Sequence, residues 1–376
     1  MVVLGSIRLC DRPCSPGRWG PSCRKPCASE ARTKQRQRGT GTMSMDGKVN
    51  EGVIPVNGAF HLGVVVRNCR ASMAAFSRIF GISRWEFQTL SEANFIDPLV
   101  YGEPRRQRFN SAVAVAGPVR FELVQSLEDD QTVYADFVSE RGYGLQHLFY
   151  TIVDVEEFAR VNQSLQNAGI GYAQNAVISD TVDYYYCDTF RVLGGNAEIL
   201  VVKGPNPAGG PPEIVDFGPE VIALPGRPVI DGLYRIGVVT AGPADEAQLA
   251  YHKVFGLDGW SEVVMSGRRS RVAAQGAMAV ELVEAEGAPL LAERAKSGGP
   301  SLTHITVAII DPQAEAETVA WFAAQGLPLV ERLTPSDGSY AVLRFDGSQV
   351  LDGVDVEIVV ALDKAGAARR LQLAQI

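Results

Sequence analysis

The sequence predicts an α+β protein in which four βαβββ units pair into two domains, each a curved mixed sheet around a cavity with helices outside. Three observations predict this fold. Four segments follow one plan, with an apolar strand, an amphipathic helix and two or three further strands. A Pro/Gly-rich stretch divides these segments into two pairs. The length of 376 residues also exceeds what one ordinary core needs.

The first pair of units occupies the first half of the chain. The first unit is predicted to have strands at 61–66, 85–89, 110–116 and 119–125 and a helix at 71–79. The second unit is predicted to have strands at 145–153, 182–188 and 197–202 and a helix at 155–168. A single unit is too small to bury its own apolar face, so we expect the two to share one core.

The second pair repeats this plan. The third unit is predicted to have strands at 233–240, 261–265, 271–274 and 278–284 and a helix at 245–255. The fourth is predicted to have strands at 302–310, 340–345 and 354–360 and a helix at 313–325. The chain is therefore expected to be an internal duplication, with right-handed crossovers between its parallel strands.

These patterns predict the domain boundaries. The expected divisions are a disordered extension at 1–55, a first domain at 57–205, a linker at 206–229, a second domain at 230–362 and a tail at 363–376. The extension is rich in Arg, Gly, Pro and Ser, and Met43 and Met45 near its end are compatible with a later translation start. Its cysteines, Cys10, Cys14, Cys23 and Cys27, allow a small zinc knot, but their spacing fits known zinc modules poorly.

Charge and composition exclude some classes of function. The net charge is −8, and because residues 1–50 carry +7, the remainder carries −15. Such an acidic body argues against nucleic acid as a partner. No apolar run reaches the length of a membrane span, so we expect a soluble protein. Cys69 and Cys187 are isolated and resemble ordinary buried thiols, which favours the cytoplasm.

Histidines and glutamates recur at equivalent positions of the units. His61, His147 and His304 each lie near the start of a unit's first strand. A carboxylate also interrupts the apolar final strand of every unit, at Glu122, Glu198, Glu281 and Glu357. On a strand that packs helices on one face, such a carboxylate points into the concave interior. Burying it there is costly unless it is paired or binds a metal.

Pairing the first two units predicts a metal site. His61, Glu122, His147 and Glu198 would line one cavity and offer two nitrogens and two oxygens to a divalent ion. Any one of these residues alone is more often a structural residue, so the prediction depends on all four being in register. In the second half Arg235 replaces the first histidine and cannot ligate a metal. We expect it to pair with a glutamate there, and a weak site of Glu281, His304 and Glu357 is the minority alternative.

Several motifs of the chain resemble the vicinal oxygen chelate superfamily of glyoxalases, bleomycin resistance proteins and dioxygenases, with glyoxalase I and methylmalonyl-CoA epimerase as the most similar members. They are His61-Leu-Gly-Val-Val-Val, Ile79-Phe-Gly-Ile, Gly144-Leu-Gln-His147-Leu and Gly194-Gly-Asn-Ala-Glu198. The resemblance covers 57–362 and is better in the first half. It places His61, Glu122, His147 and Glu198 on the family's four metal-ligand positions.

The resemblance implies a metal-dependent epimerase, isomerase or lyase that acts through a metal-stabilised enolate of a small carbonyl or thioester substrate. The metal would polarise the carbonyl, and Glu198 or Glu122 would be the general base. The cofactor is expected to be one divalent ion, and Zn, Ni, Co, Mn and Fe(II) all suit these ligands. The expected partner is a small-molecule substrate, with neither nucleic acid nor membrane, and the protein is expected to be a monomer or a homodimer.

Aromatic residues are the candidates for substrate binding, and we select Trp85, Phe109 and Tyr185. Within the run Tyr184–Tyr186 the middle residue must face opposite to its neighbours. The segment 91–108 is longer than a hairpin needs and contains Arg105, Arg106 and Arg108. We interpret it as a solvated loop, with a cover over the cavity mouth that attracts an anionic substrate as the alternative.

Two other functions remain open. Without Glu122, the residues His61, His147 and Glu198 form the two-histidine, one-carboxylate triad of non-haem Fe(II) ring-cleavage or keto-acid dioxygenases. In the dioxygenases that this chain resembles the metal belongs to the second domain, where Arg235 stands here. A metal-free, ligand-sequestering resistance protein is the second alternative, and the presence of all four ligand types argues against it.

Overall fold

The structure is a computed structural model. It describes residues 52–57, 60–117, 119–178, 181–204, 211–276, 278–293, 295, 299–309 and 315–362. The predicted extension up to residue 51, with its four cysteines, and the predicted tail lie outside the described residues. Within the described part of the chain, no helix is both long enough and apolar enough to cross a membrane.

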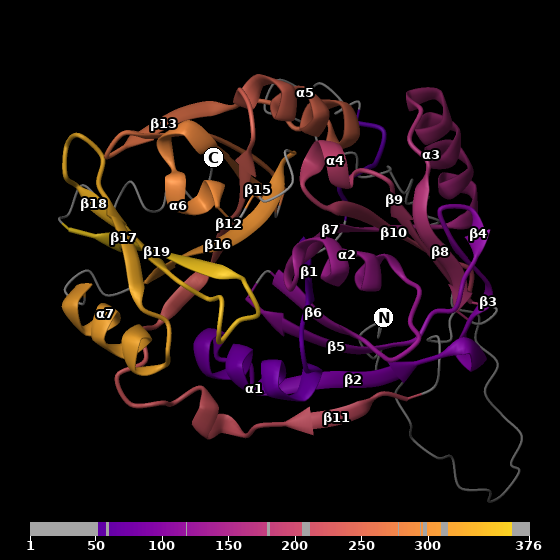
Figure 1. Ribbon diagram of the computed structural model, residues 1–376, viewed down its shortest axis with the longest axis horizontal. Helices are drawn as coiled ribbons and strands as arrows, with labels where there is room; N and C mark the ends of the chain where they lie inside the picture. The colour runs from indigo at the N-terminus through magenta and orange to yellow at the C-terminus, as the bar shows by residue number, and fades with distance from the viewer. Residues whose placement is uncertain are drawn as a thin grey trace, which may run out of the picture.

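The first half forms one strongly curved sheet (Figure 1). Its strands in spatial order are β11 (Glu213–Asp216), β2 (Arg84–Leu90), β5 (Phe109–Ala116), β6 (Val119–Ser126), β1 (Phe60–Val65), β7 (Gly144–Val153), β10 (Asn196–Val202), β9 (Val182–Cys187), β8 (Tyr172–Ile178), β3 (Ile96–Val100) and β4 (Glu103–Pro104). The parallel pairs β1–β6 and β7–β10 meet at the antiparallel pair β1–β7 in the middle of the sheet.

The second half forms a smaller sheet of the same kind. Its spatial order is β13 (Ser261–Met265), β14 (Arg268–Gln275), β15 (Met278–Glu284), β12 (Ile230–Thr240), β16 (Ser301–Ile309), β19 (Asp355–Ala361), β18 (Tyr340–Phe345) and β17 (Leu329–Leu333). This order matches that of β2 to β8 in the first sheet strand for strand, including the two parallel pairs that flank an antiparallel pair. The predicted fold class of four βαβββ units in two curved mixed sheets is therefore confirmed.

Four helices cover the convex faces of the sheets, as predicted. They are α1 (Cys69–Phe80), α3 (Val155–Ala168), α5 (Ala244–Phe255) and α7 (Glu315–Ala324). Helix α1 shows why these segments are helical. The Asn68 side chain accepts a hydrogen bond from Ala71 N at the N-terminus, and Gly81 ends the helix in the left-handed region with a φ of 71°. Its buried face, including Met73 and Phe76, joins the apolar core between helices and sheet.

One helix lies on the other side of the sheet and was not predicted. Helix α2 (Val133–Arg141) begins after Thr132, whose side chain caps Tyr134 N. Val133 and Tyr134 are buried in the core on the concave face, and Figure 1 shows α2 inside the curve of the first sheet. The expectation that all helices lie outside is therefore corrected. The remaining short helices are α4 (Phe190–Leu193), α6 (Pro289–Ala292), η1 (Glu92–Asn94), η2 (Pro219–Val221) and η3 (Ala285–Gly287).

The segment 91–108 is not a solvated loop. Strand β3 within it pairs with β8 of the second unit, and Phe95 and Val100 belong to the concave core. The segment therefore extends the sheet at its far edge and encloses the concave space. The interpretation as a loop is corrected because two buried apolar side chains, spaced too irregularly to show a strand period, anchor it.

The predicted linker is only partly a linker. Strand β11 lies within residues 206–229 and pairs with β2, so that Val215 faces Trp85 across the sheet edge. Residues 52–55, predicted to be part of the extension, contact the second half. The backbone N–H groups of Val53 and Ile54 donate to the carbonyls of Lys253 and Val254, and Ile54 is buried.

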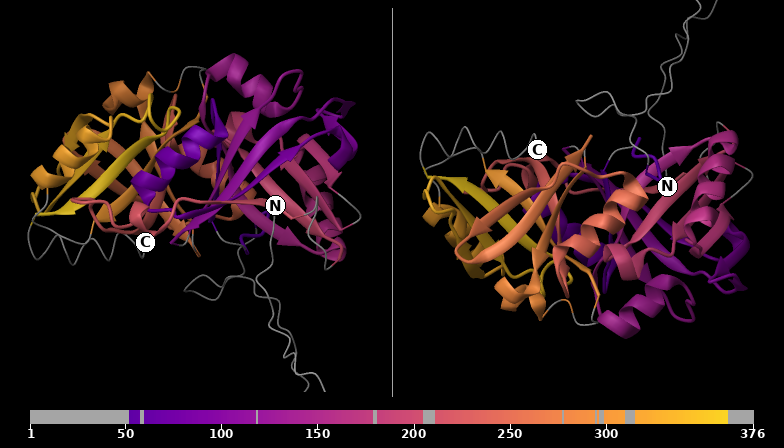
Figure 2. Two further views of the ribbon diagram at one scale, coloured as in Figure 1. Left: turned by 90° about the horizontal axis from the view of Figure 1, so that it is seen from below. Right: turned by 90° about the horizontal axis from the view of Figure 1, so that it is seen from above.

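The two halves lie side by side and share one apolar core (Figure 2). Polar contacts also join them. The Ser72 hydroxyl donates to Asp352 Oδ2 over 2.5 Å, and the Tyr251 hydroxyl donates to the Leu193 carbonyl over 2.8 Å. Both contacts are buried, so the halves pack as closely against each other as elements within one domain do.

Candidate metal centre

Four adjacent central strands bring together the four side chains that the sequence selected as metal ligands. Glu122 is on β6, His61 on β1, His147 on β7 and Glu198 on β10, and these strands are consecutive in the sheet. Their ligand atoms all lie within 4.8 Å of one another on the concave face. All four side chains are buried. Whether they bind a metal stays a prediction.

The donor atoms converge at distances that suit a transition ion. His61 Nε2 lies 3.2 Å from Glu122 Oε2 and 3.2 Å from His147 Nε2. Glu198 Oε2 is 3.8 Å from His61 Nε2 and 4.0 Å from His147 Nε2. Ligand atoms at about 2.1 Å from one ion stand about 3 Å apart when they are neighbours in the coordination shell. Only a small inward movement of Glu198 would complete such a shell.

The protonation pattern also fits a cation. The Gln146 side-chain oxygen accepts a hydrogen bond from His147 Nδ1 at 2.8 Å, which fixes the ring so that Nε2 is directed at the centre. Glu198 Oε2 has no hydrogen-bond partner among the residues that the structure describes. Burying the Glu198 carboxylate without such a partner is costly, and a bound cation would remove that cost.

A glycine makes the approach of the two histidines possible. Gly63 lies opposite His147 in the β1–β7 pair, and the His147 ring lies across the backbone at Gly63. A Cβ atom at this position would lie 1.7 Å from the ring. The second half repeats the arrangement with Gly237 and His304, where the corresponding distance is 1.8 Å. The sequence carried this signal as a glycine two residues after His61 and after Arg235.

Burial and hydrogen bonding shift the pKa values of the two carboxylates, Glu122 and Glu198, in opposite directions. Burial alone would raise the pKa of Glu122, but hydrogen bonds to His147 and His61 outweigh it and hold this pKa well below its usual value. Ser111 also donates to Glu122 Oε1 over 2.5 Å. Burial raises the pKa of Glu198 to about 7, and it lowers the pKa of His61 to about 4. Glu122 is therefore an anchored anion, whereas Glu198 exchanges protons near neutral pH.

A cavity of about 40 Å³ opens next to these carboxylates. It is lined by Leu90, Phe109, Ser111, Glu122, Tyr134, Ile178, Val182, Tyr184, Tyr186, Glu198 and Leu200. The wall is mostly apolar, and its phenol groups are hydrogen-bonded, because the hydroxyls of Tyr134 and Tyr186 lie 2.7 Å apart. Burial raises the pKa of both phenols well above the usual value, so they remain protonated donors.

The three predicted substrate contacts are placed differently by the structure. Phe109 lines the cavity. Trp85 instead lies on the convex face, where its Nε1 donates to Ser77 Oγ of α1 at 2.8 Å. Tyr185 also faces outward and stacks on Phe158 of α3 with ring centroids 4.4 Å apart. Both positions are corrections to the prediction.

Strand alternation explains the correction at Tyr185. In the β9–β10 pair, Tyr186 lies opposite Glu198 and Tyr184 opposite Leu200. Residues that pair across strands face the same side, so Tyr184 and Tyr186 point into the cavity together with Glu198. The prediction of Tyr185 was therefore wrong, although the alternation along the strand was visible in the sequence. The sequence offered no such signal for Tyr134, because α2 was not predicted.

The three arginines of segment 91–108 do not line the cavity. Arg106 pairs with Glu92 at 2.9 Å, and Arg105 lies 3.8 Å from Asp136. Arg105 and Arg106 are partly exposed, and their carboxylate partners lie outside the cavity. An anionic substrate therefore has no cationic anchor among the described residues of the cavity wall.

The second half has a different centre. Arg235 donates through Nε to Glu281 Oε2 at 2.6 Å, which is one of the two pairings that the sequence analysis expected. A second arginine, Arg268, also enters this centre and contacts both Glu281 and Glu357. His304 lies 3.5 Å from Glu357. The glutamates of the second half are therefore already neutralised by guanidinium groups.

The model of the Glyoxalase/Bleomycin resistance protein/Dioxygenase superfamily matches residues 60–184. The comparison with curated proteins gave no match.

Solved structures with similar chains have low identity. A mutant of 4-hydroxymandelate synthase from Streptomyces coelicolor aligns over 85% of this chain and 98% of its own, with 13% identity and a TM-score of 0.49. The Mn(II)-bound glyoxalase from Novosphingobium aromaticivorans aligns over 82% and 83%, with 13% identity and a TM-score of 0.45. Methylmalonyl-CoA epimerase from Mycobacterium tuberculosis aligns over 37% and 94%, with 19% identity and a TM-score of 0.30.

Proposed function

Because residues 60–184 belong to the Glyoxalase/Bleomycin resistance protein/Dioxygenase superfamily, we propose that this protein is a metal-dependent enzyme that removes a proton next to a carbonyl group. The reaction class is that of a glyoxalase-like epimerase, isomerase or lyase. One observation carries the proposal, the convergence of His61, Glu122, His147 and Glu198 beside a mostly apolar cavity. A divalent metal held by these side chains would act as a Lewis acid on the substrate carbonyl and acidify the neighbouring C–H bond.

Glu198 is the general base of this proposal. Its Oε2 has no hydrogen-bond partner among the described residues, and its pKa is raised to about 7 by burial. A buried carboxylate oxygen without a hydrogen-bond partner can accept a proton from a substrate and return it. Glu122 is less suited, because Ser111 and both histidines hold it as an anion. Glu122 therefore acts as a fixed ligand.

The phenols next to the centre support the same chemistry. Tyr186 lies with its ring 4.9 Å from the His147 ring, and its hydroxyl is paired with that of Tyr134. Both hydroxyls stay protonated because burial raises the pKa of each phenol. One of them donates to the other, and the remaining hydroxyl hydrogen can be donated to negative charge that develops on a substrate oxygen.

The cavity limits the substrate. None of the described residues that line it is Lys or Arg, so apart from the proposed metal the site offers no counter-charge to a carboxylate or phosphate. Its volume of about 40 Å³ holds only about three water molecules. We therefore expect the part of the substrate that enters to be compact, uncharged and largely apolar beyond its carbonyl oxygens.

The first test is the metal content of protein purified without a histidine tag. We expect about one equivalent per chain, lost in His147→Ala. The matched control is His252→Ala, because His252 is half-exposed on α5 and far from the centre in sequence and fold. Wild type that contains no metal and takes up none from Zn, Ni, Co, Mn or Fe(II) would overturn the proposal in favour of a ligand-binding protein.

The second test follows proton exchange. Compact neutral carbonyl compounds are incubated with the metal-loaded enzyme in D₂O, and deuterium at the carbon next to the carbonyl is measured. We expect exchange that falls by roughly 10²–10⁴-fold in Glu198→Gln, the usual effect of removing a general base. Consumption of oxygen by the Fe(II)-loaded enzyme, without such exchange, would instead identify the dioxygenase alternative.

A further inference from the structure

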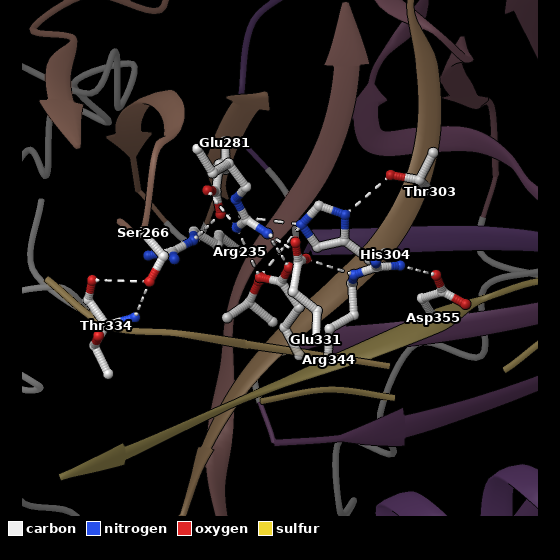
Figure 3. Close-up of polar contacts among 12 residues, drawn as sticks. Arg235, Ser266, Glu281, Thr303, His304, Glu331, Thr334, Arg344 and Asp355 are labelled. Atoms are coloured by element: carbon white, nitrogen blue, oxygen red, sulfur yellow. Dashed lines mark hydrogen bonds and ion pairs between the residues drawn. The ribbon is translucent and has the colours of Figure 1, made fainter. Parts of the chain in front are cut away.

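The second half contains a buried cluster at the positions that correspond to the candidate metal centre. We call Arg235, Arg268, Glu281, His304 and Glu357 the arginine cluster. Four of its members stand on β12, β15, β16 and β19, the strands equivalent to β1, β6, β7 and β10. Figure 3 shows Arg235, Glu281 and His304 directed toward one another between these strands. All five side chains are buried.

Arg268 is the member with no counterpart among the four ligand positions. Val113 pairs with Glu122 in the first half, and Val272 pairs with Glu281 in the second. Phe109 and Arg268 each stand four residues before these valines. Arg268 thus replaces the phenylalanine that forms an apolar wall of the first cavity.

The Arg268 guanidinium bridges the two carboxylates. Its Nη1 donates to Glu357 Oε1 at 2.6 Å, and its Nη2 donates to Glu281 Oε1 at 2.9 Å. Nη2 also lies 3.2 Å from Glu357 Oε2. In the first half, none of the described residues that line the cavity beside the equivalent carboxylates, Glu122 and Glu198, is Lys or Arg. The guanidinium therefore occupies the space between the carboxylates where a shared ion would bind.

The cluster as it stands does not fit a metal. Arg235 contacts Glu281 Oε2, so both oxygens of Glu281 already accept from guanidinium groups. A divalent ion would meet two positive charges in a buried site, and such like-charge contacts cost several kcal/mol. The remaining ligand types are nevertheless present, because ligand atoms of Glu281, His304 and Glu357 lie within 4.8 Å of one another.

We propose that the Arg268 guanidinium takes the place of a metal cation in the second half, and that Glu281, His304 and Glu357 form three quarters of a latent divalent-metal site, which opens when Arg268 is removed and Arg235 is replaced by a fourth ligand. The second half then folds without metal, because an internal cation neutralises its carboxylates. This inference concerns residues of the second half alone and does not depend on the proposed function.

The test restores the first-half pattern in the second half. Arg235→His combined with Arg268→Phe recreates two histidines, two glutamates and an apolar wall. Both substitutions are made in a His147→Ala background, so that zinc bound by the first centre does not obscure the count. We expect zinc after dialysis to rise from near zero to about one equivalent per chain. A folded variant that binds no zinc would overturn the proposal.

The control uses the neighbouring arginine of the same strand. Arg269 is exposed and pairs with Glu262, so Arg269→Phe should leave zinc content unchanged in the same background. Arg268→Lys retains a cation between the carboxylates and should also bind no zinc. Zinc bound at one equivalent in the His147→Ala parent, with both arginines present, would contradict the proposal as well.

Thermal unfolding keeps the test decisive if the variant is poorly folded without metal. Removing Arg268 leaves buried carboxylates with too little compensating charge, which destabilises a protein strongly. We therefore expect Arg235→His combined with Arg268→Phe to melt well below the His147→Ala parent and to recover on addition of zinc. The parent should show no such recovery. A melting temperature that is low and indifferent to zinc would show that the carboxylates do not bind the ion.

Discussion

The close contact between Gly63 and the His147 ring is the most sensitive point of the candidate centre. The imidazole can lie across strand β1 only because residue 63 has no side chain, and Gln146 then holds it in that orientation. The position of the His147 ring therefore depends on the absence of a Cβ atom at residue 63 of the facing strand. Gly237 and His304 make the same close contact in the second half, as expected for two copies of one framework.

Gly63→Ala is expected to disrupt metal binding. The new methyl group would lie 1.7 Å from the His147 ring and would force the imidazole away from His61. We expect metal affinity to fall by on the order of 100-fold, as for other losses of ligand orientation. Competition with a metallochromic chelator measures this affinity. Gly171→Ala is the control, because a Cβ at Gly171 meets open space. Equal affinities of the two variants would contradict the coupling.

At the scale of elements, α2 closes one side of the first cavity through Tyr134, and strand β3 extends the far edge of the sheet. Helix α2 places Tyr134 against Phe109, with ring centroids 5.0 Å apart, and against Tyr186. Strand β3 covers the far edge by pairing with β8. Neither element belongs to the repeated βαβββ plan, so the features that close the cavity are additions to the duplicated framework.

Tyr134→Ala is expected to loosen this closure. Removing a fully buried aromatic side chain leaves a void and costs about 3 kcal/mol or more of unfolding free energy. Tyr134→Phe removes only the hydrogen bond to Tyr186 and should cost about 1 kcal/mol. Urea denaturation measures both values. Similar costs for the two variants would show that the phenol hydrogen bond, and not packing of the ring, holds α2 in place.

At the scale of the whole molecule, the two halves share one topology but differ in what faces their buried carboxylates. The first centre converges on acceptors, whereas the second is filled by guanidinium groups. Burial alone would raise the pKa of Glu281, but Arg235 and Arg268 outweigh it and hold this pKa well below 4.5. Burial likewise opposes the lowering of the Glu357 pKa, which Arg268 and His304 produce.

These lowered pKa values predict how stability depends on pH. A carboxyl group whose pKa is lower in the folded state stabilises the fold above its unfolded pKa, and this contribution is lost as pH falls through the folded pKa. The stabilisation that ionised Glu281 provides should therefore begin to fall below pH 4.5, which is the ordinary pKa of this group. The difference in unfolding free energy between wild type and Glu281→Gln should be largest at neutral pH and shrink toward about pH 3.

Urea denaturation at a series of pH values gives this difference directly. Glu156→Gln is the control, because Glu156 is exposed on α3 with 88% of its side-chain surface accessible. Its effect should be small at every pH. A constant difference for Glu281→Gln between neutral pH and about pH 3 would contradict the lowered pKa.

The sequence by itself determined the duplicated framework and the positions of the four candidate ligands. Strand-borne His61 and His147, and glutamates in otherwise apolar strands, recur in register, and the period of two along a strand decides which face they share. Arg235 was likewise recognisable as unable to ligate a metal. These inferences needed only the spacing of residues along single strands, and this spacing decides which face a side chain is on.

Only the tertiary structure decided what surrounds those positions. Arg268 reaches Glu281 and Glu357 from a different strand, α2 enters the concave face from a polar stretch of sequence, and β3 pairs with a strand of another unit. Trp85 and Tyr185 face outward because sheet curvature and pairing register select the side of each residue. Such contacts join residues far apart in the chain, and their energies depend on packing that no local pattern encodes.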